Sequence, residues 1–135
     1  MSRNISFSLT TPQFLDGSKD VTRRMGWAHL KVGDELCAVE KSQGLGKGGK
    51  VKRLGMIRVK SVRREFLREL TDRDDGYGFE EARREGFEGY SPPMFVHFFC
   101  GSHRGCTPDT VVTRIEFVRI DVPVDGALRS DGETK

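Results

Sequence analysis

The chain has 135 residues, 36% of them hydrophobic, which suits one compact domain with a single core. No apolar run is long enough to span a bilayer, and the N-terminus lacks the apolar core of a secretory signal, so we expect a cytoplasmic protein with no membrane partner. Three cysteines without an export signal favour reduced thiols over a disulfide framework.

The net charge of +3 conceals an uneven distribution of charges along the chain. Residues 41–68 hold ten lysines and arginines against one acid, Glu65, whereas residues 69–91 are mainly acidic. Two interpretations carry equal weight: a surface that attracts a polyanion, or opposite charges that offset one another in the folded protein.

The first elements lead into a stretch rich in reactive groups. Alternating apolar and polar residues predict a half-buried strand over residues 4–10. Thr11 and Pro12 are typical of a helix start, and Gly17 is typical of a helix end. Residues 17–24 then pack an amine, a carboxylate, a hydroxyl and two guanidinium groups into eight positions, which favours a functional loop.

The middle of the chain combines a tryptophan, a glycine-rich segment and basic residues. Trp27 is interpreted as a core or rim anchor, with base stacking as the alternative. A strand is expected over residues 35–40. Segment 42–50 carries Lys47 and Lys50 without a phosphate-loop motif, so we expect a hairpin connection that adds affinity for phosphates regardless of sequence. A long strand over residues 51–62, kinked at Gly55, includes Arg53.

The second half of the chain predicts two helices and a final strand. A helical turn is expected over residues 65–70, and a short helix over residues 79–84 is closed by Gly86. Ser91 and Pro92 predict the start of a second helix that runs through Phe99 and buries one face. The last strand is expected over residues 110–120, and the composition of residues 121–135 predicts a flexible tail.

Lys19, Thr22 and Glu85 form a candidate catalytic set. A threonine hydroxyl needs a neighbouring base, and a lysine can serve if its pKa is lowered. Arg23 and Arg24 would lower the pKa of Lys19, while an adjacent aspartate would raise it, so the direction of the shift stays open. From spacing alone, a surface loop and an ion-paired glutamate are the simpler interpretation.

A second cluster has residue types that bind zinc. His97, Cys100, His103 and Cys106 recur every three residues, whereas structural zinc sites pair their ligands in two separated clusters. We therefore expect no metal and no cofactor. Cys100, His103 and Cys106 would be the ligands under the minority zinc hypothesis.

Several motifs occur together in an order that is typical of a known family. They are Gly17-Ser18-Lys19 with Thr22 and Arg24, then residues 30–34 (LKVGD), Glu85-Gly86-Phe87 and residues 112–117 (VTRIEF). In this order they resemble the ASCH domain family, in the form found in bacteria and their phages. The resemblance covers roughly residues 5–120. It implies an α+β fold, a small PUA-like β-barrel with short flanking helices, with the ASCH domain over residues 1–120.

The resemblance also implies a basic cleft that binds RNA or a modified nucleoside. Some small bacterial members are amidohydrolases that remove the acyl group of N4-acetylcytidine with a Lys, a Thr and a Glu, positions matched here by Lys19, Thr22 and Glu85. By this analogy Thr22 attacks the amide carbonyl, Lys19 takes its proton and Glu85 gives one to the leaving amine. Arg24 would contact the substrate or the developing oxyanion.

Other members of the family bind or cleave RNA, so a non-catalytic module for RNA or single-stranded DNA is the alternative. An interaction domain with neither activity is a third hypothesis. The residues expected to contact a substrate are Arg23, Arg24, Trp27, Lys47, Lys50 and Arg53. The long cationic loop departs from the smallest amidohydrolases and would suit a polynucleotide better than a free nucleoside. We expect a monomer.

Overall fold

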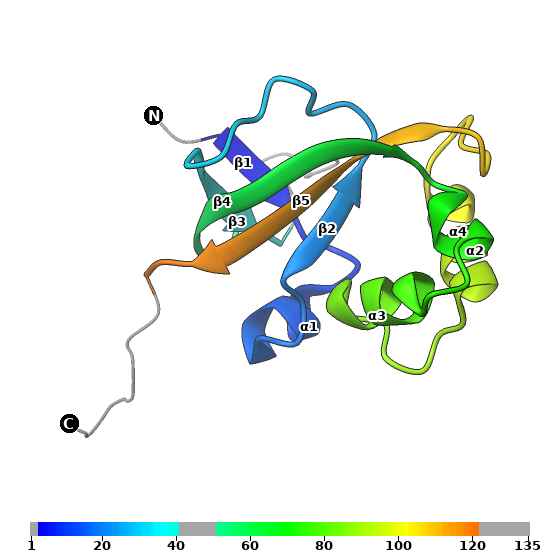
Figure 1. Ribbon diagram of the computed structural model, residues 1–135. Helices are drawn as coiled ribbons and strands as arrows, with labels where there is room; N and C mark the ends of the chain where they lie inside the picture. Colours follow the sequence, from blue (N-terminus) through cyan, green and yellow to red (C-terminus); the bar gives the residue numbers. More distant parts are fainter. Residues whose placement is uncertain (1–2, 41–50, 122–135) are drawn as a thin grey trace.

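The structure, a computed structural model, describes residues 3–40 and 51–121 (Figure 1). Its centre is a five-stranded sheet in the order β1-β3-β4-β5-β2. The strands are β1 (Arg3–Ser6), β2 (Val21–Arg24), β3 (Glu35–Val39), β4 (Arg53–Phe66) and β5 (Val111–Arg119). β1 pairs with β3 in parallel, and every other neighbouring pair is antiparallel.

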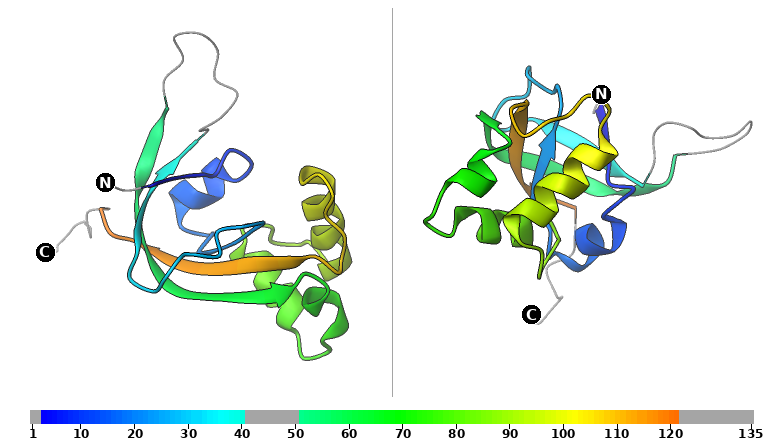
Figure 2. Two further views of the ribbon diagram at one scale, coloured as in Figure 1. Left: turned by 90° about the horizontal axis from the view of Figure 1, so that it is seen from above. Right: turned by 90° about the vertical axis from the view of Figure 1, so that its right-hand side faces the viewer.

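Four short helices complete the described fold: α1 (Thr11–Asp16), α2 (Glu69–Asp72), α3 (Tyr77–Arg84) and α4 (Pro92–Ser102). The sheet curls strongly, and α2, α3 and α4 gather at one end of β4 and β5 (Figures 1 and 2). Among the described residues, no helix combines the length and the apolar character needed to cross a membrane. The architecture is a small α+β half-barrel, as predicted.

Two hydrophobic clusters form the interior, and β5 contributes to both. The barrel cluster includes Phe7, Phe14 and Phe117, whereas the helical cluster includes Phe95 and Phe99. On β5, Ile115 and Phe117 belong to the barrel cluster, and Val112 belongs to the helical cluster. Since both faces of this strand are covered, residues 112–115 are all buried, polar residues included.

Predicted helix ends agree with the structure, and strand ends differ. Gly17 ends α1 with a φ of 84°, and the Ser91 side chain caps α4 by accepting a hydrogen bond from the Met94 amide (3.3 Å). The first strand ends at Ser6 rather than at residue 10, because the chain turns there. β4 continues to Phe66, where a helical turn was expected, because its pairing with β5 extends to that residue. Apart from residue 121, the predicted tail lies outside the described residues.

A buried network of arginines and glutamates joins α3 to the sheet. Arg23 on β2 donates through Nε to Glu65 Oε2 (2.9 Å) and through Nη1 to Glu85 Oε2 (3.1 Å), and its Nη2 donates to Glu81. Arg114 on β5 holds the same Glu81 carboxylate through Nε (2.6 Å) and Nη2 (3.0 Å). Burial alone would raise the pKa of Glu81, but the bonds from Arg114 and Arg23 lower it to about 2.

We expect Glu81→Gln to destabilise the fold by about 3–5 kcal/mol at neutral pH, because it leaves the buried Arg114 without its carboxylate partner and removes one of the three carboxylates that hold Arg23. The pKa of Glu81 is lowered in the folded state, so its contribution is present above pH 4.5 and is lost as the pH falls toward 2. The stability difference between wild type and variant should shrink over this range in chemical denaturation. Glu80→Gln, at an exposed position of the same helix, is the control and should change stability much less, because its ion pair with Arg83 is open to solvent. A stability difference that stays the same between pH 4.5 and pH 2 would contradict the lowered pKa of Glu81.

Candidate active site

The segment after α1 is held by backbone hydrogen bonds to two helices. The Lys19 amide donates to the Gln13 carbonyl in α1 (3.1 Å), and the Asp20 amide donates to the Arg84 carbonyl at the end of α3 (2.9 Å). β2 begins at the next residue and pairs antiparallel with β5. Lys19 and Thr22 are therefore fixed by backbone pairing on a rigid part of the fold.

Gly86 lets the end of α3 approach Lys19. Its φ of 99° lies in the left-handed region that favours glycine. A Cβ atom at this position would lie 2.8 Å from Gln13 Cβ and 3.4 Å from Lys19 Cβ. A side chain here would strain the backbone and press on α1, so glycine allows Glu85, the preceding residue, to reach Lys19.

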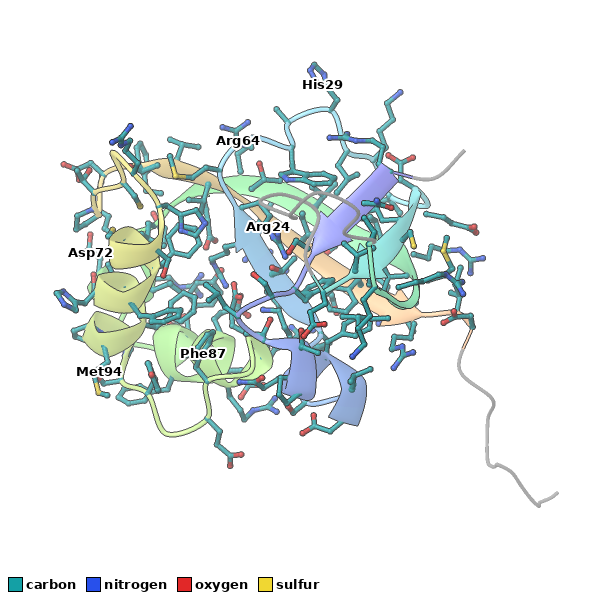
Figure 3. The ribbon with its side chains drawn as sticks, turned by 180° about the vertical axis from the view of Figure 1, so that it is seen from behind. Arg24, His29, Arg64, Asp72, Phe87 and Met94 are labelled. Carbon is teal, nitrogen blue, oxygen red and sulfur yellow. The ribbon has the colours of Figure 1, made fainter. Side chains whose placement is uncertain are left out.

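A cavity of about 260 Å³ lies between the sheet, the β1–α1 connection and α4. Its lining combines the polar side chains of the predicted catalytic set with aromatic rings. The lining residues used below are Lys19, Thr22, Arg23, Arg24, Glu85, Phe87, Phe98, Phe99, Ser102 and His103. Figure 3 marks two of them, Arg24 from β2 and Phe87 beside α3. Residues that are remote in sequence thus meet at one hollow.

Lys19 and Glu85 form a direct pair at this cavity. The Lys19 Nζ atom donates to Glu85 Oε1 (2.9 Å) and to the Glu85 backbone carbonyl (2.8 Å). Both side chains are almost fully buried, at 3% and 4% exposure. Burial lowers the pKa of Lys19, and the positive charges of Arg24 and Arg23 lower it further, against the opposing effect of Glu85.

Thr22 is paired with Arg24 rather than with Lys19. Arg24 Nε donates to Thr22 Oγ1 (3.0 Å), and Arg24 Nη2 donates to the Ser6 carbonyl (2.6 Å). Burial lowers the pKa of Arg24 to about 10. No hydrogen bond joins Lys19 to Thr22 among the described residues, although both line the cavity. A guanidinium that donates to the hydroxyl oxygen favours the deprotonated form of that hydroxyl.

The other predicted substrate contacts lie in different settings. Arg23 reaches the cavity, but its guanidinium is turned toward the carboxylates of the buried network. Trp27 packs against the barrel cluster, with the Arg3 guanidinium 4.2 Å from the ring centroid, and does not line the cavity. Arg53 pairs with Asp121 (3.1 Å), also away from the cavity. Lys47 and Lys50 lie outside the described residues.

The predicted zinc ligands do not come together as a set. Cys100 Sγ and Cys106 Sγ lie 3.1 Å apart. The His103 ring instead stacks on Phe99, with centroids 4.1 Å apart, and its Nδ1 lies 2.8 Å from the Phe99 carbonyl. In residues 3–40 and 51–121, no group of three or more His, Cys, Asp or Glu side chains is arranged to hold a metal ion.

Sequence reasoning missed the aromatic part of the site. Phe98 and Phe99 were assigned only to the buried face of a helix, yet they line the cavity together with Phe87. Their rings lie within one group of contacts, since Phe87 and Phe98 have centroids 5.0 Å apart. The signal that points to this role is the density of aromatic residues directly after the Glu85-Gly86 motif.

Comparisons with known proteins bear on the fold. No family model matches the sequence, and no curated protein sequence matches it. The structure is similar to the crystal structure of protein EF3133 from Enterococcus faecalis, of the family described as DUF984, with a TM-score of 0.57, 16% identity, and coverage of 89% of this chain and 80% of that one. A mutant of ZmASCH from Zymomonas mobilis gives a TM-score of 0.50 and 13% identity, over 95% of this chain and 79% of that one. The chain therefore shares the fold of these two solved structures, one of which is an ASCH protein.

Proposed function

We propose that the protein is an amidohydrolase that cleaves the N4-amide of an N4-acylated cytidine. The observation that carries the proposal is that Lys19, Thr22 and Glu85 line one cavity, although Lys19 and Glu85 are 66 residues apart in the chain. These are the positions that the resemblance to ASCH amidohydrolases assigns to the base, the nucleophile and the acid. The contacts of this chain support each role separately.

Charge balance around Lys19 favours its neutral form. The groups that face one another in this buried region are Lys19, Arg23 and Arg24 from the β2 segment, Glu65 from β4, Tyr77, Glu81 and Glu85 from the α3 segment, and Arg114 from β5. With Lys19 neutral, three buried arginines balance three buried glutamates; Arg63 and Arg84, which also pair with Glu65 and Glu81, are more exposed to solvent. An added ammonium charge would be uncompensated, which is costly where water is excluded. Lys19 is thus suited to accept a proton.

We propose the following reaction for the residues that line the cavity. Thr22 Oγ1 attacks the acyl carbonyl carbon while its proton passes to Lys19, and the hydrogen bond from Arg24 stabilises the oxygen as it loses that proton. The bond from the carbonyl carbon to N4 then breaks. The proton on Lys19 reaches N4 through the Glu85 carboxylate, so cytidine leaves with a free amino group. Water that loses its proton to Lys19 cleaves the acyl ester on Thr22, and Thr22 recovers its proton as the carboxylic acid departs.

The cavity suits a single nucleoside unit. Its volume of about 260 Å³ is close to the lower end of ligand pockets, which span roughly 300–1,000 Å³. The rings of Phe87, Phe98 and Phe99 supply apolar surface on which a planar base can stack. The N4-amide of that base can then approach Thr22 while the base itself remains among the rings.

In residues 3–40 and 51–121, surface charges give little support to the binding of a polynucleotide. The basic residues in the described part of the 41–68 segment are mostly paired with acids: Lys52 with Glu40, Arg53 with Asp121, Arg58 with Glu35, Lys60 with Glu116, Arg63 with Glu65, and Arg68 with Asp109. Arg64 is the exception within the described residues. Paired cations contribute less to an attraction for phosphates than free ones do. We therefore favour a free nucleoside over RNA or single-stranded DNA.

Turnover of N4-acetylcytidine by the purified protein tests the proposal, with release of cytidine followed by chromatography. We expect Lys19→Ala and Thr22→Ala to lower kcat/KM by about 10²–10⁴-fold, because each removes a group that acts in the transition state. Lys31→Ala, at an exposed position, is the control and should retain activity. Absence of turnover by the wild type, under conditions in which a known deacylase works, would remove the enzymatic proposal.

The pH profile of kcat/KM should change when Arg23 is replaced. Activity requires neutral Lys19, so its acid limb reports the pKa of Lys19, which lies below the usual 10.5. Arg23→Gln removes a nearby positive charge and frees Glu85 Oε2, and both changes favour the ammonium form. We expect the acid limb to move to higher pH, toward the usual pKa of a lysine. Arg23→Lys should restore most of the wild-type profile.

A structural role of Arg23 alone would leave that limb in place. Titration of the Lys19 side chain by ¹³C NMR, assigned with Lys19→Ala, measures the same pKa without a substrate. If Arg23→Gln lowered stability but left both the NMR midpoint and the acid limb unchanged, the charge-balance argument would be wrong.

Binding to a labelled single strand separates the nucleoside enzyme from a nucleic-acid module. We expect weak binding with a shallow dependence on salt, because most described surface cations are already paired. A steep slope of log K against log salt, reduced by about 0.7 in Arg64→Ala, would instead favour the non-catalytic module.

A further inference from the structure

Two thiols meet where α4 ends. Cys100 lies in the last turns of α4 and Cys106 in the connection that follows, and their Sγ atoms are 3.1 Å apart. Both pack against the helical cluster, and both remain partly exposed to solvent. The remaining cysteine, Cys37, lies on β3 in the part of the sheet away from α4 (Figure 1).

The local backbone brings the two thiols together. Helix α4 ends at Ser102, and His103 is extended, with a φ of −134°. A turn follows, closed by a hydrogen bond from the Cys106 amide to the His103 carbonyl (3.2 Å). Gly105 adopts a φ of 77° within this turn, which a residue with a side chain tolerates poorly. The turn folds the chain back so that Cys106 contacts the helix it has just left.

We propose that Cys100 and Cys106 form a reversible disulfide site that controls the rim of the cavity. Ser102 and His103 lie between the two cysteines in the chain, and both line the cavity. A bond between the cysteines would close a small ring around these two residues. The ring would limit the movement of His103, whose imidazole stacks on Phe99 at the same cavity.

The oxidation is a thiol–disulfide exchange with glutathione disulfide as the oxidant. The thiolate of one cysteine attacks glutathione disulfide, forms a mixed disulfide and releases one glutathione. The thiolate of the second cysteine attacks the cysteine sulfur of that mixed disulfide, forms the Cys100–Cys106 bond and releases the second glutathione. The two cysteines lose two electrons, and their two protons are balanced by the two glutathione thiols formed.

Contact between the two thiols favours formation of the Cys100–Cys106 bond over reversal of the mixed disulfide by glutathione. The attacking sulfur is held beside its target, so the step is intramolecular and needs no refolding. Burial raises the pKa of the Cys100 thiol, and its contact with Cys106 raises it further. Because the thiolate is the reactive form, ring closure should become faster as the pH rises.

Intact mass spectrometry of the full chain tests the site after incubation with glutathione disulfide at about pH 8 and quenching with an alkylating agent. We expect the cysteine pair to lose two hydrogen atoms and to take up no alkyl group, so that Cys37→Ser carries no label and the wild type carries one label, at Cys37; reductant should reverse the loss. Cys100→Ser and Cys106→Ser should instead retain a glutathione adduct on the remaining partner. Persistent adducts on both cysteines of Cys37→Ser, or a bond that includes Cys37 in the wild type, would overturn the proposal.

Two further measurements keep the test independent of the proposed reaction. Gly105→Val should slow ring closure while leaving formation of the mixed disulfide unchanged, because it disfavours the turn that aligns the thiols. In Cys37→Ser, the His103 ring resonances in NMR spectra should shift on oxidation and return with reductant. Unshifted His103 resonances would overturn control of the cavity rim, and an unchanged rate in Gly105→Val would overturn the role of the turn. Neither readout requires N4-acetylcytidine to be a substrate.

Discussion

The Glu85 carboxylate, shared between Lys19 and Arg23, is the interaction on which the site depends. One oxygen holds the amine at the cavity and the other holds a guanidinium that is itself anchored to Glu81 on α3. Because α3 reaches the sheet through these charges, the segment that carries Glu85 is positioned by the same network that sets the charge of Lys19. Fold and chemistry are therefore coupled through one group of buried ions.

The aromatic and the polar parts of the cavity come from different parts of the fold. The polar groups lie on β2 and at the end of α3, where backbone pairing and Gly86 fix them. The rings come mainly from α4, whose position depends on packing in the helical cluster. A ligand that combines a planar base with a reactive amide matches this division, since each of its parts meets lining of its own kind.

Short-range features could be predicted from the sequence, and long-range contacts could not. Gly17 and Ser91 mark helix ends correctly, because capping is decided by a few neighbouring residues. Spacing alone predicted an ion-paired glutamate at a helix end without naming its partners, and only the family resemblance grouped Glu85 with Lys19. The extension of β4 to Phe66 depends on its pairing with β5, and the role of Phe98 depends on how α4 packs; neither is encoded by local periodicity. The uneven charges along the chain allowed two interpretations, a surface that attracts a polyanion or opposite charges that offset one another in the folded protein. Ion pairs such as Arg58–Glu35 support the second.

β5 contributes to both hydrophobic clusters, and the cavity is lined from each: Phe7 belongs to the barrel cluster, and Phe95 and Phe99 belong to the helical one. A strand that is shared in this way prevents either cluster from losing its order alone, so the molecule should melt as one cooperative unit. A compound that occupies the boundary between the clusters would then raise the melting temperature of the whole domain, even if it touches only a few side chains.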